Sequence, residues 1–205
     1  MVEVLMKIIL NDEEQIIKQT VEKKQGIIET IDKLVDGNIL SHIIINDYPI
    51  YIEIEDYIDR HLNDIEKIQI ITKTKSEFVN DTLLTAENYL EHGINAIEHL
   101  ADQFYQTPTQ EDWNQFKNFT DGLNWINNVI LNIDSLKERP SNWNDYVKIY
   151  HDLENGVREL AEAVEGNDEI LIADIINYEI KSIYEKLNKL ITTTIDTEGC
   201  RPNAN

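Results

Sequence analysis

The spacing of apolar residues changes near residues 73–76, and this change constrains the fold more than any other feature. Up to about Thr74 the apolar residues stand in short, β-branched blocks, as they do in strands. From Ser76 onward they recur at alternating steps of four and three residues, with almost no Pro or Gly between them. Such steps are typical of long helices packed side by side. The pattern therefore predicts an α+β protein with a small α+β domain over 1–74, a helical domain over 75–195 and a flexible tail over 196–205.

The first domain is predicted to contain two strands, a helix, two more strands, a turn and a last strand. We expect these elements at 2–10, 15–22, 26–35, 39–46, 49–54, 55–58 and 65–72, with a turn at 11–14 and the third and fourth strands joined by Asp47-Tyr48. This order resembles the β-grasp fold of ubiquitin-like domains. The segment Ile43–Ile50 looks like the strand-turn-strand that follows the ubiquitin helix, and Tyr57–Leu62 stands where that family has its late turn. Another small α+β sheet would satisfy the same pattern.

The resemblance also limits function. Ubiquitin and the sulfur carriers act through a free Gly-Gly terminus, whereas this chain continues through Thr72-Lys73-Thr74 into a helix. Conjugation and sulfur transfer are therefore excluded for the sequence as written. The resemblance leaves the other use of this fold, which is an adaptor surface.

The second domain is predicted to be an antiparallel four-helix bundle. We expect the first helix from about Ser76 to Tyr105 and the second between breaks at Thr107-Pro108-Thr109 and Arg139-Pro140-Ser141. The third ends at Gly166, and Asn167-Asp168 opens the fourth. Short connections between long helices place neighbouring helices antiparallel. The segment Asp168–Ile180 resembles an uncharacterised family of helical-bundle proteins from low-GC Gram-positive bacteria, which supplies no activity to carry over.

Three glycines occupy the middles of the predicted helices, at Gly93, Gly122 and Gly156. A glycine inside a helix costs about 1 kcal/mol relative to alanine, so three of them call for a common reason. One interpretation is that the missing side chains let helix backbones approach closely, with Ala173 as the small residue of the fourth helix. The other is a cavity or ligand floor at that level.

The sequence contains no recognisable catalytic or cofactor motif, and we assign no catalytic, cofactor-binding or metal-ligating residue. His92 and His99 are two helical turns apart, about 10 Å, which is too far to share one metal ion. Cys200 is the single cysteine. The acidic residues invite comparison with the all-helical nucleotide pyrophosphohydrolases, which hold magnesium on paired acidic helices. Glu159 and Glu162 match the first acidic helix of that pattern, whereas Glu169 and Asp174 do not match the second because they are five residues apart. If this chain were such a hydrolase, the candidate metal-binding residues would be Glu159, Glu162 and Asp174.

The formal net charge of −21 argues against several classes of partner. Phosphate backbones and anionic membranes attract Lys and Arg, so nucleic acid and membrane surfaces are disfavoured. No apolar run reaches the ~18 residues of a membrane helix. The N-terminus lacks the pattern of a signal peptide, so we expect a cytoplasmic protein. From Ser76 to Phe116 there are eight acidic residues and no Lys or Arg, which places a strongly negative face on the first long helix.

These features favour a non-enzymatic adaptor or chaperone-like module that binds another protein, with a basic partner favoured by the charge. Trp125 stands beside the predicted core seam and is expected to be partly exposed. It either packs at the edge of the core, which is the favoured interpretation, or serves as a partner anchor. The sequence does not discriminate between binding a second copy of the chain and binding a different protein. The alternative function is a metal-dependent hydrolase that uses the acidic helix pair.

Overall fold

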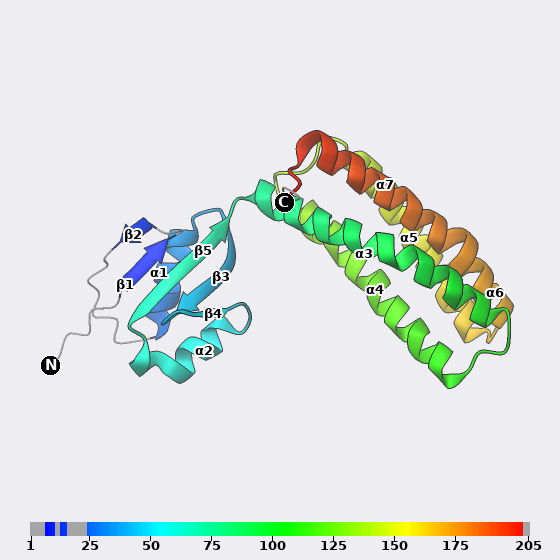
Figure 1. Cartoon of the computed structure of the whole chain (residues 1–205), viewed down its shortest axis with the longest axis horizontal. Coiled ribbons are helices and arrows are strands. Elements are labelled where there is room, and N and C mark those ends of the chain that lie inside the picture. Colours follow the sequence, from blue (N-terminus) through cyan, green and yellow to red (C-terminus); the bar gives the residue numbers. More distant parts are fainter. Residues whose placement is uncertain (1–6, 11–12, 16–23, 203–205) are drawn as a thin grey trace. The chain divides into compact units, whose positions relative to one another are not determined.

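The computed structural model describes residues 7–10, 13–15 and 24–202. It is an α+β structure, mainly helical, with a small mixed sheet in its N-terminal part (Figure 1). The chain divides into two compact units, Met1–Phe78 and Val79–Asn205. The division falls inside a helix that begins at Lys75, shortly after the predicted change in periodicity. Within the described residues, no helix is both long and apolar enough to cross a membrane.

The first unit is built on a mixed sheet whose strands lie in the order β2-β1-β5-β3-β4. Strand β1 pairs parallel with β5, and the other pairs are antiparallel. The strands are β1 (Lys7–Leu10), β2 (Glu13–Gln15), β3 (Ile39–Ile45), β4 (Tyr48–Ile50) and β5 (Lys67–Lys73). The helices are α1 (Lys24–Val35), α2 (Ile54–His61) and the short 3-10 helix η1 (Leu62–Asp64).

The predicted element order is confirmed for the described residues, with shifted boundaries. Strand β2 already contains Glu13 and Glu14, which were expected in a turn. The rest of the strand predicted at 15–22 lies outside the described residues. The expected turn at 55–58 is a helix of two turns, α2, and the last strand starts two residues later than predicted.

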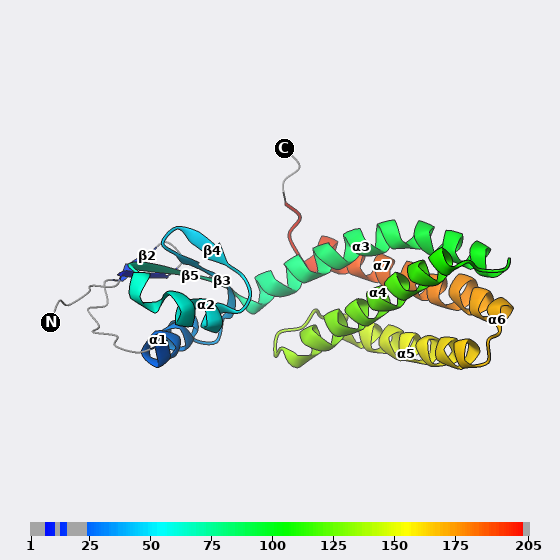
Figure 2. The same ribbon diagram turned by 90° about the horizontal axis from the view of Figure 1, so that it is seen from below.

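The core of this unit lies on one face of the sheet. Ile43 and Ile45 of β3 are buried beside Ile68 and Ile70 of β5, and both strands therefore show the period of two that one buried face produces. Isoleucines from α1 and α2 complete the same cluster, so both helices cover that face of the sheet (Figure 2).

The β3–β4 hairpin turns at Asn46-Asp47, one residue earlier than the predicted Asp47-Tyr48. Both residues have positive φ, at 47° and 68°. A two-residue hairpin loop of this kind needs positive φ at both positions, which Asn and Asp tolerate better than a bulky aromatic residue does. Tyr48 consequently belongs to β4, where it is exposed.

In its described residues, the second unit contains six helical elements rather than the four helices predicted. They are α3 (Lys75–Phe104), α4 (Gln110–Ser135), α5 (Trp143–Glu165), α6 (Glu169–Asp174), the π-helical segment η2 (Ile175–Ile180) and α7 (Lys181–Glu198). The first three agree with the predicted helices. The predicted fourth helix corresponds to α6, η2 and α7, which follow one another without a break in helical structure. Within the described chain, π-helical geometry is confined to η2.

Side-chain caps fix where α3 and α4 begin. The Thr74 hydroxyl accepts a hydrogen bond from the Glu77 backbone amide, and the Glu77 carboxylate accepts one from the Thr74 amide. Thr109 and Asp112 form the same capping box at the start of α4. Each box satisfies backbone amides that the first helical turn leaves without partners.

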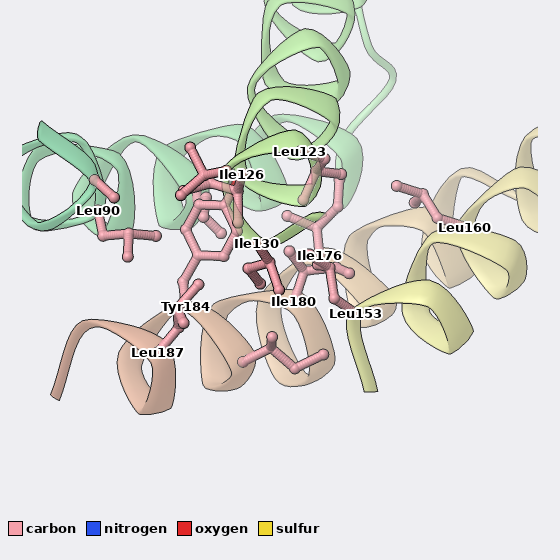
Figure 3. Close-up of a cluster of buried hydrophobic side chains, with 14 of the residues drawn as sticks. Leu90, Leu123, Ile126, Ile130, Leu153, Leu160, Ile176, Ile180, Tyr184 and Leu187 are labelled. Atoms are coloured by element: carbon pink, nitrogen blue, oxygen red, sulfur yellow. The ribbon is translucent and has the colours of Figure 1, made fainter. Parts of the chain in front are cut away.

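The core of the second unit is a single cluster to which all its helices contribute. Figure 3 shows side chains from α3, α4, α5, η2 and α7 converging, with Leu90, Ile126, Leu153 and Ile180 among them. Each of these four is at most 1% exposed. The alternating steps of four and three residues therefore face the interior, as predicted.

Each mid-helix glycine faces a side chain of a neighbouring helix, so the interpretation that two helix backbones approach closely there is wrong. A methyl group at Gly122 would overlap the Tyr89 hydroxyl of α3. A methyl group at Gly156 of α5 would lie 2.7 Å from Cδ1 of Ile180. In both cases the partner side chain fills the space that the glycine leaves empty, so the glycines are packing devices of a different kind from the one expected.

Residues 199–202, which we call the C-terminal strap, pack back on the start of α3. The prediction of a flexible tail from residue 196 differs from the structure, since α7 continues to Glu198. The Cys200 amide donates to Oδ1 of Asn80 at 2.8 Å, and Asn80 Nδ2 donates to the Cys200 carbonyl at 2.9 Å. A local sequence pattern does not reveal these contacts because the two residues are far apart along the chain.

Arg201 anchors the strap by pairing with two carboxylates. Its guanidinium donates to both oxygens of Glu87, at 2.7 and 2.9 Å, and to Asp196 at 2.7 Å. Glu87 is only 7% exposed and also accepts from the Thr192 hydroxyl. The hydrogen bonds from Arg201 are the main reason that the pKa of Glu87 lies below its ordinary value.

Candidate functional site

A groove of about 700 Å³ lies between α3, α4 and α7 of the second unit. Along α3 it is lined by successive turns of one helix face, from Thr85 to Leu100. Helix α4 contributes residues between Gln115 and Trp125, and α7 contributes Tyr184. We call this surface the α3/α4 groove. Its volume is in the range of binding sites for small molecules or for side chains of a partner.

Aromatic side chains form one end of the groove. The Tyr89 ring meets Trp125 edge to face, with centroids 5.0 Å apart, and Tyr184 at 6.5 Å. The absent side chain at Gly122 allows Tyr89 to reach across to α4. Trp125 is 36% exposed, which confirms the predicted partial exposure and leaves part of the indole open to a partner.

The floor of the groove is made of small residues and one buried phenol. A methyl group added at Gly93 would lie 3.7 Å from the Tyr184 ring, and Gly93 lines the groove. The third mid-helix glycine therefore does lie at a cavity, as the second interpretation of the glycines expected. The Tyr184 side chain is almost fully buried and points from α7 toward Ile126 of α4 (Figure 3). Among the residues that the structure describes, its hydroxyl has no hydrogen-bond partner. Burial, and next the neighbouring Tyr89, raise the pKa of Tyr184, so the phenol stays neutral.

The groove is mainly apolar inside and acidic at its rims. None of its described lining residues is Asp, Glu, Lys or Arg. Exposed carboxylates stand one helical turn from lining residues on both helices: Asp81 before Thr85, Glu91 after Asn88, Glu111 before Gln115 and Asp121 before Trp125. Lys117, the nearest basic residue in sequence, is two positions from both Gln115 and Phe119 and so lies on another face of α4. A bound group would therefore meet an apolar floor between two negative edges.

The acidic residues of the hydrolase alternative have other neighbours. The Tyr105 hydroxyl donates to Asp174 at 2.6 Å, and this bond is the main cause that raises the pKa of Tyr105 to about 12. Glu159 faces Glu179, whose pKa is raised by burial and then by Glu159. Glu162 is exposed. Within the described residues, no group of three or more His, Cys, Asp or Glu side chains is placed to hold a metal ion.

The two histidines singled out from the sequence lie along α3 beside the groove. His92 lines it, and its Nδ1 bonds to the Asn88 carbonyl at 2.7 Å. His99 lies near the Asp112 carboxylate. The sequence did not point to most of the lining residues, because the groove depends on how far α3 and α4 stand apart. Two signals were present: the glycines at 93 and 122, and the aromatic residue at 125.

The comparisons with known proteins concern the same unit. No curated protein and no solved structure was found to match the chain. The model of one family, described as "Domain of unknown function (DUF8042)", matches residues 81–190, which is more than half of the chain. Every residue that lines the α3/α4 groove falls within this range. The chain therefore belongs to the DUF8042 family.

Proposed function

We propose that this chain is a non-enzymatic, cytoplasmic adaptor or chaperone-like module, and that the α3/α4 groove is where it binds a partner protein. The observation that carries the proposal is the groove itself: an open, apolar surface of about 700 Å³ with a partly exposed Trp125 at one end. Partly exposed aromatic residues beside an apolar pocket are the usual anchors of protein interfaces. The partner is either another protein or a second copy of this chain.

We also propose an architecture for this adaptor. In it, residues 1–74 are a β-grasp-like, ubiquitin-like domain, and residues 75–195 are an antiparallel four-helix bundle in which α6, η2 and α7 count as one helix. The parallel pairing of β1 with β5 and the two helices on one face of the sheet support the first part. The unbroken helical stretch from Glu169 to Glu198 supports the second. The first domain would then present an adaptor surface, since it continues into α3 instead of ending in a reactive Gly-Gly.

The proposal is tested by filling the groove. Ala96 lines the groove and is exposed, whereas its exposed neighbour Asn95 does not line it. We expect Ala96→Trp to occupy the space that a partner needs, and Asn95→Trp to leave that space open. Each purified protein is incubated with an extract of its native host, cross-linked and examined by mass spectrometry.

We expect the unmodified chain and Asn95→Trp to capture the same protein repeatedly, and Ala96→Trp to lose it. Circular dichroism and thermal unfolding would verify that both variants fold. Repeated recovery of the chain cross-linked to nothing would refute an adaptor role. Equal capture by Ala96→Trp would show that the partner binds somewhere other than the groove.

A further inference from the structure

The length of the α3/α4 groove suits an elongated occupant. Its two ends on α3, Thr85 and Leu100, are fifteen residues apart. At 1.5 Å per residue this separation is ~22 Å along the helix axis, the length of about four helical turns. A compact small molecule would fill only part of it, whereas a helix laid between α3 and α4 would follow its whole length.

The chemistry of the groove matches a helix with one apolar face. Phe119, Ile97 and Leu100 give an apolar surface toward one end, and Trp125 with Tyr89 gives another. Between these ends Gly93 and Ala96 supply floor without bulk, which leaves room for large side chains of an occupant. An amphipathic helix presents large apolar side chains at successive turns, so it can fill both ends at once.

The charges around the groove indicate which residues the polar face of that helix should carry. The four exposed carboxylates of the rims, Asp81, Glu91, Glu111 and Asp121, stand on both sides of the groove. The stretch from Ser76 to Phe116, which holds three of these four, has no Lys or Arg of its own, and Lys117 stands one helical turn before Asp121. An acidic helix would be repelled, whereas Lys and Arg flanking the apolar face would meet opposite charge. The exposed face of Trp125 would also attract a cation placed over its ring.

We infer that the α3/α4 groove binds a basic amphipathic helix of a partner protein, with the apolar face of that helix in the groove and its Lys and Arg side chains against the acidic rims. This inference rests on the proposed function and names the class of partner. An anionic lipid surface presents the wrong charge to these rims, and a partner strand would need a free strand edge, which the helices of this unit do not offer.

Three synthetic peptides of about eighteen residues, long enough for a helix that covers the groove, test the inference. The first places Leu on one helix face and Lys on the other. The second keeps the Leu face but has Glu in place of Lys. The third has the composition of the first in an order that gives no apolar face. Binding of each labelled peptide to the full chain is measured by fluorescence anisotropy at about 50 and 300 mM salt.

We expect the Leu/Lys peptide to bind the unmodified chain at least tenfold more tightly than either other peptide. Ala96→Trp should weaken that binding about tenfold, and Asn95→Trp should leave it unchanged. Glu91→Gln combined with Asp121→Asn removes two rim charges, so it should weaken binding several-fold at low salt and much less at high salt. These substitutions replace exposed side chains by isosteric ones, so the fold is preserved.

The other outcomes overturn the inference. Equal binding of the first and third peptides would mean attraction by charge alone, without the groove. Tighter binding of the Leu/Glu peptide, or none of the Leu/Lys peptide, would refute a basic helix as the occupant. If Ala96→Trp nevertheless lost a protein captured from the native host, the adaptor function would stand and only this partner class would fall. If Ala96→Trp changed neither measurement, the groove would be excluded as the docking site.

Discussion

The two sides of the helical unit are packed in different ways. On one side α5 lies alongside α6, η2 and α7, and Ile180 fills the space that Gly156 leaves on α5. On the other side Tyr89 of α3 reaches to Gly122 of α4, and the α3/α4 groove remains beside it. Both sides use a mid-helix glycine to receive a side chain from a neighbouring helix.

The size and shape of the received side chain separate the two outcomes. The isoleucine at Gly156 is compact and fully buried, so the helices close around it. The tyrosine at Gly122 is long and only partly buried, so it crosses between α3 and α4 and leaves space next to its ring. The same sequence device, a glycine in a helix, therefore gives a closed core in one place and an open groove in the other.

The largest expected effect is the difference in stability between two variants, each with one side chain truncated to alanine on one of the two sides. Ile180→Ala should lower the free energy of unfolding by about 2–5 kcal/mol, because it leaves a cavity in the closed core. Phe119→Ala in the groove should cost only about 1 kcal/mol, since its side chain is already partly exposed to solvent. Urea unfolding followed by circular dichroism measures both. Equal losses for the two variants would remove the distinction between a closed side and an open side.

The next prediction concerns whether replacing a mid-helix glycine by alanine raises or lowers the stability of the fold. Gly93→Ala should raise stability by up to about 1 kcal/mol, because a methyl group there makes ordinary contact with Tyr184 and alanine favours a helix. Gly156→Ala should lower stability by about 1 kcal/mol, because crowding against Ile180 exceeds the same helical gain. Thermal unfolding of the two variants gives the comparison. A stabilised Gly156→Ala variant would contradict close packing of α5 against η2.

A smaller effect is expected at the C-terminal strap, which holds α3 against α7. The pKa of Glu87 is lowered mainly by Arg201, so ionised Glu87 stabilises the fold at pH values above its unfolded pKa. That contribution disappears as the pH falls through the lower, folded pKa. Arg201→Met should therefore reduce the unfolding midpoint at pH 7, and the difference from the unmodified chain should shrink below about pH 4.

Urea midpoints at several pH values test this prediction. Arg158→Met is the matched control, because Arg158 is exposed and its guanidinium bonds to the side chain of Asn155 three residues away on the same helix. A strap that contributed nothing would give Arg201→Met and Arg158→Met the same midpoint at pH 7. A difference that grew toward low pH would contradict the assigned role of Glu87.

The smallest expected effect is that of divalent metal ions. Mg²⁺ or Mn²⁺ should shift the unfolding temperature by less than about 1 °C, because Asp174 is bonded to Tyr105 and Glu159 faces a single carboxylate. Differential scanning fluorimetry with and without nucleotides measures the shift. A stabilisation of several degrees that Glu159→Gln abolishes would favour the hydrolase alternative.

Much of the fold follows from local patterns. Helices α3, α4 and α5 and strands β3 and β5 agree with the predictions to within a few residues, because each has a clear period and a capping or turn residue at its ends. The capping box at Thr109 and Asp112 is an example of a boundary that two residues determine locally. The Asn46-Asp47 turn was misplaced by one residue because the sequence near Tyr48 allowed two positions for the loop.

The candidate site was predictable only in part. The partial exposure of Trp125 and the unusual glycines were visible in the sequence, and so was the acidic stretch on α3. The groove was not, because it depends on how α3 and α4 pack around the Tyr89 side chain. The strap was missed because Cys200 and Arg201 bind residues more than a hundred positions earlier, Asn80 and Glu87.

The sequence alone determined most of the element types, the change from an α+β domain to a helical one, and the acidic character of α3. These properties depend on residues a few positions apart, for which periodicity and side-chain propensity are sufficient. Tertiary structure alone decided that Gly156 closes a core while Gly122 borders a groove, and that the strap is fixed to Glu87. Such outcomes depend on which side chain of another helix packs against each glycine or carboxylate. A local sequence pattern does not specify that side chain.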